Sequence, residues 1–254
     1  MGGCHMRVCA LLLLKGRSVV QSYSFSSYRF IGDPVITCNH LDKWAIDEIL
    51  ALQIDDDFES LVYNLSAISK VSTTPITVGG GISSLSQAKE LIKLGADRLC
   101  LQNILFTDFA EVLKISDTYG GQSITISLPF DLSNKLLKPS KLPFEKFYEW
   151  FNLHNSILHK HGIADFLFVD MLADGIVAMP SFNWLDHLPL EESSVILAGG
   201  LSVANIYHVL KDHVGKYEDL SIAVGNFLYH KELPNLQLLK SIQNLTPNHR
   251  LLQT

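Results

Sequence analysis

Four charged residues stand at the beginnings of four apolar segments that have the pattern of strands. They are Arg7, Glu48, Arg98 and Asp165, two positive and two negative. If their side chains point inward, they form a charge-balanced ring across one end of a closed sheet. Buried charges are costly unless they are paired, so stability alone would favour apolar residues there. The alternative is four independent surface charges. Asp97, beside Arg98, would face outward on the same rim, where a partner could pair with it.

Two glycine-rich turns follow apolar segments and could hold anions. The first comprises 79–81 with Gln102 and Asn103, and the second comprises 174–175, 199–200 and 225–226. Glycine lets the backbone approach a phosphate, and the helix that follows offers free N–H groups. The alternative is a purely structural role, in which these glycines only make tight strand-to-helix turns. Two such turns together suggest a ligand with phosphate at both ends, or the remains of such a site.

Carboxylates are missing from the ends of the first and fifth strands, where acid–base chemistry would need them. The first strand ends in four leucines and Lys15, a possible cation for substrate binding, and the fifth ends in Ser127-Leu-Pro-Phe-Asp131. Asp131 lies two residues past the expected strand end. Neither strand therefore clearly projects an acid.

Three histidines share a predicted helix, at positions 154, 159 and 161. Their spacing does not stack two rings as i, i+4 metal ligands. We expect solvated helix residues, and neither a metal nor a cofactor.

Eight short apolar segments and the helix-period segments between them must position these residues. Strands are expected at 7–14, 48–54, 75–79, 98–102, 122–128, 165–171, 194–198 and 220–225. Helices are expected at 34–45, 58–69, 85–94, 106–118, 144–161, 203–214 and 232–242, and only 180–188 is a poor helix. The spacing of the first four strands nearly matches that of the last four, and the unit at 75–103 recurs at 195–226. These features predict an α/β fold, a closed (β/α)8 TIM barrel with an internal two-fold half-barrel repeat; a doubly wound open sheet is the alternative.

Composition narrows the class of protein. Charged residues are only 18% of the 254, which fits strands buried on both faces, and the net charge is −6. No basic cluster appears, so nucleic acid is not an expected partner. The longest N-terminal apolar run is too short to span a membrane. We expect one domain over 1–254, with a leader at 1–6 and a C-terminal tail at 246–254.

The cysteines indicate the compartment. There are four, with no C-x-x-C pair and no zinc-like spacing, so buried free thiols are the better interpretation. That suits a reducing compartment, and we expect a cytoplasmic protein.

The two-fold repeat, Thr77-Val-Gly-Gly-Gly-Ile with Gly95-Ala-Asp-Arg, and Gly32-Asp33-Pro34 resemble the cyclase subunit of imidazole glycerol phosphate synthase, HisF. The resemblance runs from Arg7 to about Leu245. It implies a barrel that takes ammonia from a glutaminase subunit docked at its N-terminal face. The ammonia passes through the barrel, and an imidazole ring is closed at the C-terminal face.

Family roles transfer only in part. The resemblance assigns the ammonia gate to Arg7, Glu48, Arg98 and Asp165, and contact with the glutaminase to Asp97. It assigns phosphate binding to Gly81, Asn103, Asp174, Gly175, Gly200, Gly225 and Asn226. The two catalytic aspartates, however, fall on Leu13 and Pro129, and the aspartate at the end of strand two falls on Gln53. Loss of a positioned acid–base group costs roughly 10²- to 10⁴-fold in rate.

The leucine-rich first strand resembles diverged HisF paralogues linked to bacterial surface-polysaccharide genes. That likeness implies a glutaminase-like partner and a separate sugar amidotransferase, with ammonia used to form an amidino group. Pro129 departs even from that pattern. Two alternatives stay open: an authentic cyclase that uses Asp131 or another acid, and a non-catalytic barrel that binds a phosphosugar or nucleotide. A phosphoribosyl isomerase is disfavoured because it also needs acids on strands one and five.

Overall fold

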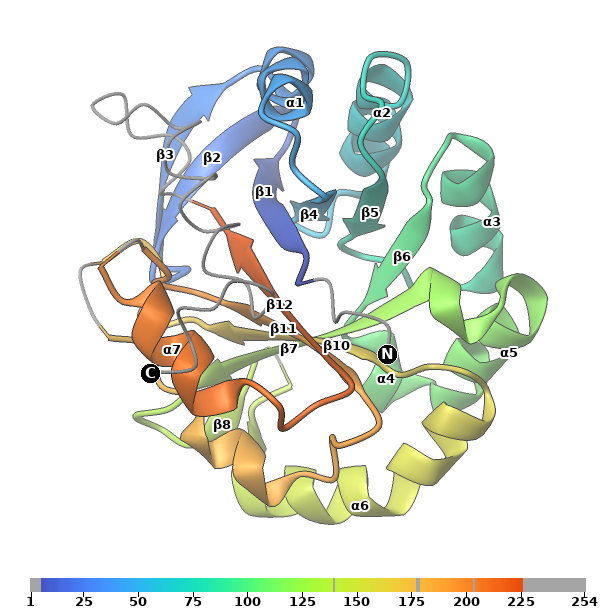
Figure 1. The fold of residues 1–254 in the computed structure, drawn as a ribbon. Helices are drawn as coiled ribbons and strands as arrows, with labels where there is room; N and C mark the ends of the chain where they lie inside the picture. The colour runs from blue at the N-terminus through green and yellow to red at the C-terminus, as the bar shows by residue number, and fades with distance from the viewer. Residues whose placement is uncertain (1–5, 139, 177–178, 203, 226–254) are drawn as a thin grey trace, which may run out of the picture.

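Eight parallel strands close into a barrel in the computed structural model, which describes residues 6–138, 140–176, 179–202 and 204–225 (Figure 1). The strands are β1 (Val8–Lys15), β4 (Glu48–Gln53), β5 (Ile76–Gly79), β6 (Arg98–Leu101), β7 (Ile124–Asp131), β10 (Asp165–Asp170), β11 (Ser194–Ala198) and β12 (Asp219–Val224). Each strand pairs with the next in that order, and β12 pairs with β1, which closes the sheet. The predicted (β/α)8 architecture is confirmed.

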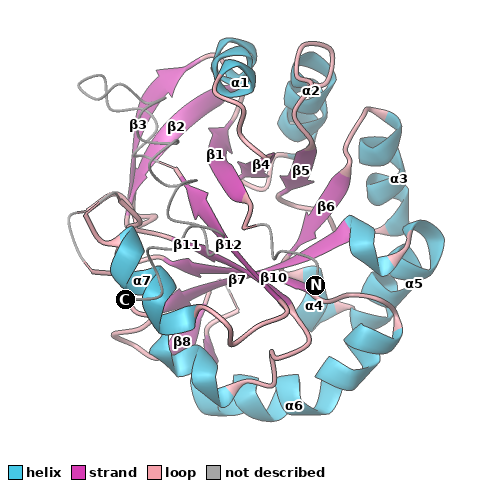
Figure 2. Cartoon of the chain, viewed as in Figure 1, coloured by secondary structure: helices cyan, strands magenta, loops and turns pink. Residues whose placement is uncertain are grey.

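Helices surround the barrel (Figure 2). They are α1 (Pro34–Lys43), α2 (Phe58–Ile68), α3 (Leu85–Lys93), α4 (Ile104–Thr107), α5 (Phe109–Tyr119), α6 (Phe144–Lys160) and α7 (Ile206–His213). Two 3-10 helices, η1 (Gly121–Ser123) and η2 (Asn183–His187), complete the set within the described residues. The poor helix expected at 180–188 is no α-helix: in the described part of that connection the helical segment is η2.

Side-chain caps explain where several helices begin. The Asp33 carboxylate accepts hydrogen bonds from the backbone N–H groups of Val35 and Ile36, at 2.8 and 3.1 Å, and Pro34 follows it in the first turn. Ser84 caps α3 in the same way, since its hydroxyl accepts from the backbone N–H of Gln87 at 3.3 Å. These caps satisfy N–H groups that have no partner within the helix.

Two antiparallel hairpins add to the barrel and were not predicted. β2 (Ser18–Tyr23) pairs with β1 and with β3 (Ser27–Gly32), and the short β8 (Leu136–Leu137) and β9 (Leu142–Pro143) extend from β7. β1 turns into β2 through Gly16 and Arg17, and Gly16 has a φ of +52°. A two-residue turn with a glycine is a hairpin signal that the pattern of Lys15-Gly-Arg-Ser18 already contained.

The apolar core has two shells, because successive strand residues point to opposite faces. One shell fills the barrel and includes Cys9, Leu50, Cys100 and Leu167. The other lies between the strands and the helices and contains, from β7, residues 124, 126, 128 and 130. Complete burial of each such aliphatic side chain contributes about 1.5–3 kcal/mol.

The internal repeat is visible in the backbone. Gly80 and Gly199 have φ values of +112° and +93°, and Gly81 and Gly200 have +68° and +67°. A Cβ on Gly80 would lie 2.1 Å from the carbonyl oxygen of Gln53, and one on Gly199 would lie 2.2 Å from that of Asp170. Only glycine fits these turns, because both the φ angle and the close approach exclude a side chain.

Three expectations need correction. The fifth strand runs to Asp131 rather than ending at 128. The helix expected at 106–118 is divided at Asp108, which caps α5. Met6, expected in the leader, is 2% exposed and belongs to the outer shell of the core. The rest of the leader, the last expected helix and the tail lie outside the described residues.

Candidate functional site

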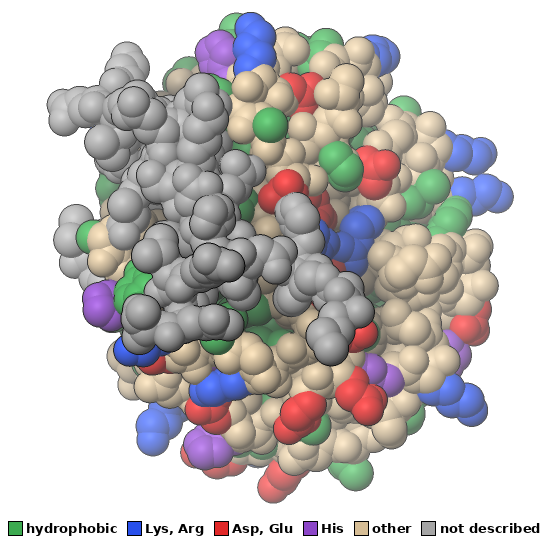
Figure 3. Space-filling model, viewed as in Figure 1, with side chains coloured by type: hydrophobic (Ala, Val, Ile, Leu, Met, Phe, Trp, Pro, Cys, Tyr) green, Lys and Arg blue, Asp and Glu red, His purple; other side chains and the backbone are tan. Residues whose placement is uncertain are grey.

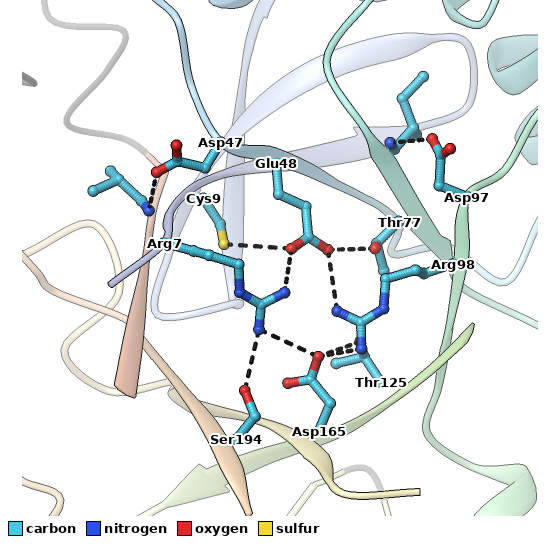
Figure 4. A network of polar contacts seen from close by, with 12 residues as sticks. Arg7, Cys9, Asp47, Glu48, Thr77, Asp97, Arg98, Thr125, Asp165 and Ser194 are labelled. Atoms are coloured by element: carbon cyan, nitrogen blue, oxygen red, sulfur yellow. Dashed lines mark hydrogen bonds and ion pairs between the residues drawn. The ribbon is translucent and has the colours of Figure 1, made fainter. Parts of the chain in front are cut away.

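The four charged residues at the strand starts do meet across the N-terminal end of the barrel (Figure 4). Arg7 Nη1 lies 2.8 Å from Glu48 Oε2, and Arg7 Nη2 lies 3.4 Å from Asp165 Oδ2. Arg98 pairs with the same two carboxylates, at 3.8 Å from Glu48 Oε1 and in direct contact with Asp165. The charges therefore alternate in sign around a closed ring, which we call the charged ring. The alternative of four independent surface charges is wrong.

Hydroxyl groups from the intervening strands complete the charged ring. Thr77 donates to Glu48 Oε1 at 2.5 Å, and Thr125 donates to Asp165 Oδ2 at 3.4 Å. Arg7 Nη2 donates to Ser194 Oγ at 3.2 Å. The two threonine hydroxyl groups thus reduce the desolvation cost of the buried carboxylates, and Ser194 does the same for the Arg7 guanidinium.

The barrel turns apolar immediately above the charged ring. Two residues further along each of the four chain segments lie Cys9, Leu50, Cys100 and Leu167, all in the interior shell of the core. This follows from the two-residue period of a strand. The two carboxylates are nearly buried, with Glu48 3% exposed and Asp165 6% exposed. Although desolvation lowers the pKa of Arg7, the neighbouring Asp165 and Glu48 carboxylates raise it above its ordinary value.

Basic and acidic side chains meet near the centre of this face of the molecule (Figure 3). Asp97 is exposed, as expected, and its carboxylate accepts a hydrogen bond from the backbone N–H of Ile76 at 2.8 Å. Asp47 does the same for Val8 at 2.7 Å. Each aspartate directly precedes a member of the charged ring. Through its hydrogen bond, each also fixes the start of a neighbouring strand.

A cavity of about 470 Å³ opens at the opposite, C-terminal end of the barrel. Polar groups of the β5 and β6 loops line one side of it, and these include Gly81, Ser83, Asn103 and Thr107. The structure thus brings together Gly81 and Asn103, the two residues of the first predicted anion site to which the resemblance assigned phosphate binding. A volume of this size is typical of small-molecule sites.

Leu13 and Pro129, the positions to which the resemblance assigned catalytic aspartates, both line this cavity. Neither side chain can exchange a proton. Gln53 also lines it, but its side-chain amide donates to the carbonyl of Gly16 at 3.0 Å and to Asp55 at 2.6 Å. Gln53 therefore anchors the turn between β1 and β2.

Asp131, the acid nearest to the expected catalytic position, is engaged elsewhere. Its carboxylate accepts hydrogen bonds from Ser133 Oγ at 2.8 Å, and from the backbone and side-chain nitrogens of Asn134 at 3.0 and 2.8 Å. Burial raises its pKa, but these bonds outweigh burial and hold the pKa below its ordinary value. Asp131 is not among the residues that line the cavity. It stabilises the turn into β8 and stays ionised.

The second predicted phosphate site is not part of the cavity. Asp174, Gly175, Gly200 and Gly225 do not line it, and Asn226 lies outside the described residues. Asp174 is 5% exposed, and burial raises its pKa to about 6. The two halves of the upper mouth, alike in sequence, therefore differ in the structure.

Among the described residues that line the cavity, Lys138 is the one cation and Asp56 the one carboxylate, and the strand pattern singled out neither. The Nζ of Lys138 lies 3.9 Å from Asp131 Oδ2, and Lys138 comes from the loop that follows β8. Lys15, the expected cation, is exposed and lies over the ring of Tyr28 at 4.7 Å. Tyr28 and Phe25 of the β2–β3 hairpin form part of the cavity wall. The turn at Gly16 is a sequence feature from which the hairpin could be predicted. No sequence feature predicted the position of Lys138 at the cavity.

The remaining candidate ligands are separate from one another. The three histidines are half-buried rather than fully solvated, and each contacts a different group: Trp150, Ser193 and Asp117. Within the described ranges, no three His, Cys, Asp or Glu side chains are placed to hold a metal ion. Cys9, Cys38 and Cys100 are buried free thiols, as predicted, while Cys4 lies outside the described residues. No helix in the described part of the chain could cross a bilayer.

Comparison with known proteins gives one family and a group of relatives. Residues 7–234 match the family described as "Histidine biosynthesis protein". A protein of Vibrio vulnificus, provisionally named imidazole glycerol phosphate synthase subunit hisF2, is 32% identical over 48% of this chain and 46% of its own length. A protein of Pseudomonas aeruginosa with the same provisional name is 30% identical over 48% and 50%. The imidazole glycerol phosphate synthase subunit HisF of Dictyoglomus thermophilum is 25% identical over 81% and 84%. The match to the first two relatives spans only about half of their length.

Proposed function

Because the chain belongs to the histidine biosynthesis protein family, we propose that it is a HisF-like barrel subunit that relays ammonia without closing an imidazole ring. A glutaminase partner docks at the N-terminal face and releases ammonia there. The ammonia crosses the charged ring, passes through the barrel and leaves at the upper mouth. Nitrogen then serves amidation of a surface sugar by a separate amidotransferase.

One observation carries this proposal: the contrast between the two ends of the barrel. The lower end holds two buried carboxylates paired to two arginines, a costly arrangement where apolar packing would suffice for stability. The upper end places Leu13 and Pro129 where ring closure would require acids. A protein that keeps the entrance and lacks the acids is suited to relay rather than to cyclisation.

The charged ring also suggests how passage would be controlled. Its arginine side chains bridge both carboxylates, so a small amine can cross only when one bridge opens. Arg7 is the better candidate to move, because its side chain is 25% exposed against 18% for that of Arg98. Its contact with Asp165 is the longer of the two arginine contacts to that carboxylate, whereas its contact with Glu48, at 2.8 Å against 3.8 Å, is the shorter.

Co-expression with glutaminase homologues tests the proposal. We expect a stable complex and a stimulation of glutamine hydrolysis of about tenfold, within the usual range of coupling between sites. Asp186→Asn, which removes a charge from an exposed pair with Lys216, should leave both the complex and the stimulation unchanged. If neither complex nor stimulation occurs with any homologue, the relay is refuted and a binding barrel becomes the better assignment.

A second measurement separates relay from cyclisation. We expect that the chain does not restore growth of a histidine auxotroph that lacks the cyclase, because Asp131 is held in its turn away from the cavity. Growth would show that another acid performs ring closure, and the non-cyclising part of the proposal would fail.

A further inference from the structure

Ser221 occupies the same level of the barrel interior as three members of the charged ring. A barrel layer takes its side chains from alternate strands, and β4, β6, β10 and β12 alternate in the pairing order. Two residues past Glu48, β4 is level with Arg98 across β5, and two residues past Arg98, β6 is level with Asp165 across β7. Two residues past Asp165, β10 is level with Ser221 across β11 in the same way. Ser221 is therefore the uncharged fourth member of this layer.

The hydroxyl group of Ser221 has no hydrogen-bond partner among the described residues. Ser221 is 0% exposed, and its Oγ is one of six buried side-chain polar atoms in the described part of the chain that lack a partner. Arg98 Nε and Asp165 Oδ1, from the same layer, are two of the others. A buried polar group without a partner costs free energy, and such groups commonly bond to an ordered water. Three such atoms in one layer therefore indicate a small polar guest at this level of the barrel.

A column of small residues leads from Ser221 toward the cavity. The inner face of β12 continues with Ala223 and Gly225, because inward-facing residues of a strand are two apart. The other three alternate strands carry larger residues at these two levels: Leu50, Cys100 and Leu167 at the first, and Leu52, Gln102 and Val169 at the second. The three residues at the second level line the cavity. The column on β12 therefore runs from the charged ring to the level where the cavity begins.

The column carries no ionisable side chain. An ammonium ion that left the layer would lose the carboxylates of Glu48 and Asp165 and gain no other charge, and the desolvation of an unpaired ion is costly. Neutral ammonia avoids this cost. It can accept a hydrogen bond from a serine hydroxyl or donate one to it, and a water molecule can do the same.

Arg7 lies beside Ser221. The backbone N–H of Ile222, the next residue on β12, donates to the carbonyl oxygen of Arg7 at 3.1 Å. Arg7 is also the arginine that the proposed function expects to move. Movement of its side chain therefore opens the charged ring next to the Ser221 hydroxyl.

We propose that Ser221 is a positioning residue of the ammonia path. Its hydroxyl group holds a water molecule in the resting protein, and it binds neutral ammonia when ammonia leaves the charged ring. The path then follows the inner face of β12 to the cavity. This inference deepens the proposed function and rests on it for the identity of the guest as ammonia.

A crystal structure of the chain alone tests the guest site. We expect an ordered water within hydrogen-bond distance of Ser221 Oγ, and its loss in Ser221→Ala. Urea denaturation gives a second readout with Ser116→Ala as the matched control, because Ser116 is also buried but donates to the carbonyl oxygen of His161 at 2.7 Å. The midpoint should fall less for Ser221→Ala, which breaks no bond within the protein. A wild-type structure without this water, or equal falls of the two midpoints, would overturn the inference.

The complex with a glutaminase tests the role in the path. Ser221→Thr and Ser221→Val have the same shape and differ in the hydroxyl group. We expect kcat for glutamine hydrolysis in the complex to be about three- to tenfold lower for Ser221→Val, the usual worth of one hydrogen bond, because ammonia that leaves slowly delays the next turnover. KM for glutamine, which binds to the partner, should not change, and Ser116→Ala should keep the wild-type kcat.

Equal kcat values for Ser221→Thr and Ser221→Val, in a complex that the wild type stimulates, would overturn the path through Ser221 and leave the relay standing. No stimulation by the wild type would instead refute the relay, and with it ammonia as the guest. The water at Ser221 is tested on the chain alone, so the two failures are distinct.

Discussion

The two ends of this barrel differ in how they place charged side chains. The lower end brings four charges together on the axis, and each carboxylate contacts both arginines. The upper end lines its cavity with Leu13, Pro129 and the amides of Gln53 and Asn103, and keeps its nearest acid, Asp131, in a turn. Four charged side chains thus meet at the lower end, whereas the described residues that line the upper cavity include only Lys138 and Asp56 as charged residues.

The comparison separates residues whose presence is explained by stability from residues whose presence is not. A turn aspartate such as Asp131 is explained by the hydrogen bonds it accepts. A buried ring of four charges is not, because well-packed apolar side chains are often as stable or more so. The charged ring is therefore the stronger indication of function, although the cavity is the larger feature.

Breaking the charged ring should produce the largest effect. Arg98→Met leaves Glu48 and Asp165 to share one arginine, so we expect the free energy of unfolding to fall by about 3–5 kcal/mol. Urea denaturation measures it. Asp186→Asn breaks an exposed pair instead and should cost less than about 1 kcal/mol. Equal stabilities of Arg98→Met and the wild type would mean that the buried charges need no partner.

The upper mouth should respond to pH through Asp174, whose pKa burial raises from 3.8 to about 6. Between these values the unfolded chain loses its proton first, so Asp174 lowers stability as the pH rises and the loss is complete above pH 6. The expected loss is about 3 kcal/mol. Asp174→Asn lacks this penalty, so its stability relative to the wild type should rise by about 2–3 kcal/mol between pH 4 and pH 7.

Urea denaturation of both proteins at the two pH values gives this difference directly. A difference that does not change with pH would show that the Asp174 carboxyl group is solvated in the folded protein. The contact of Ser22 and Ser24 in the β2–β3 hairpin with the loop at 172–174 would then be looser than their hydrogen bonds indicate.

Substitution of Asp97, which lies outside the charged ring on the same face, should affect stability least and partner binding most. Asp97→Asn keeps an oxygen to accept from Ile76, so the free energy of unfolding should change by less than about 0.5 kcal/mol. We expect the affinity for the glutaminase to fall about fivefold, as an interfacial charge is lost. Asp47→Asn is the matched control, since it has the same bond to Val8. Equal losses of affinity would point to net charge rather than to a specific contact.

Much of the fold could be predicted from local pattern. The strands are buried on both faces and so appear as continuous apolar runs, and caps such as Ser84 and glycines such as Gly95 mark the helix ends. The members of the charged ring could be predicted as well, because each begins a strand and parallel strands start at the same end of the sheet. Lys138 could not be predicted, because its place depends on two-residue strands that have no periodicity.

The sequence by itself determined the barrel, its repeat and the types of residue at both mouths, because these follow from the order and period of apolar residues. Only the tertiary structure decided how the two equivalent glycine turns are used. The turn between β2 and β3 contacts the loop at 172–174, which is about 150 residues away in the chain. Such a contact depends on where the closed sheet places two distant loops, and no local pattern encodes that distance.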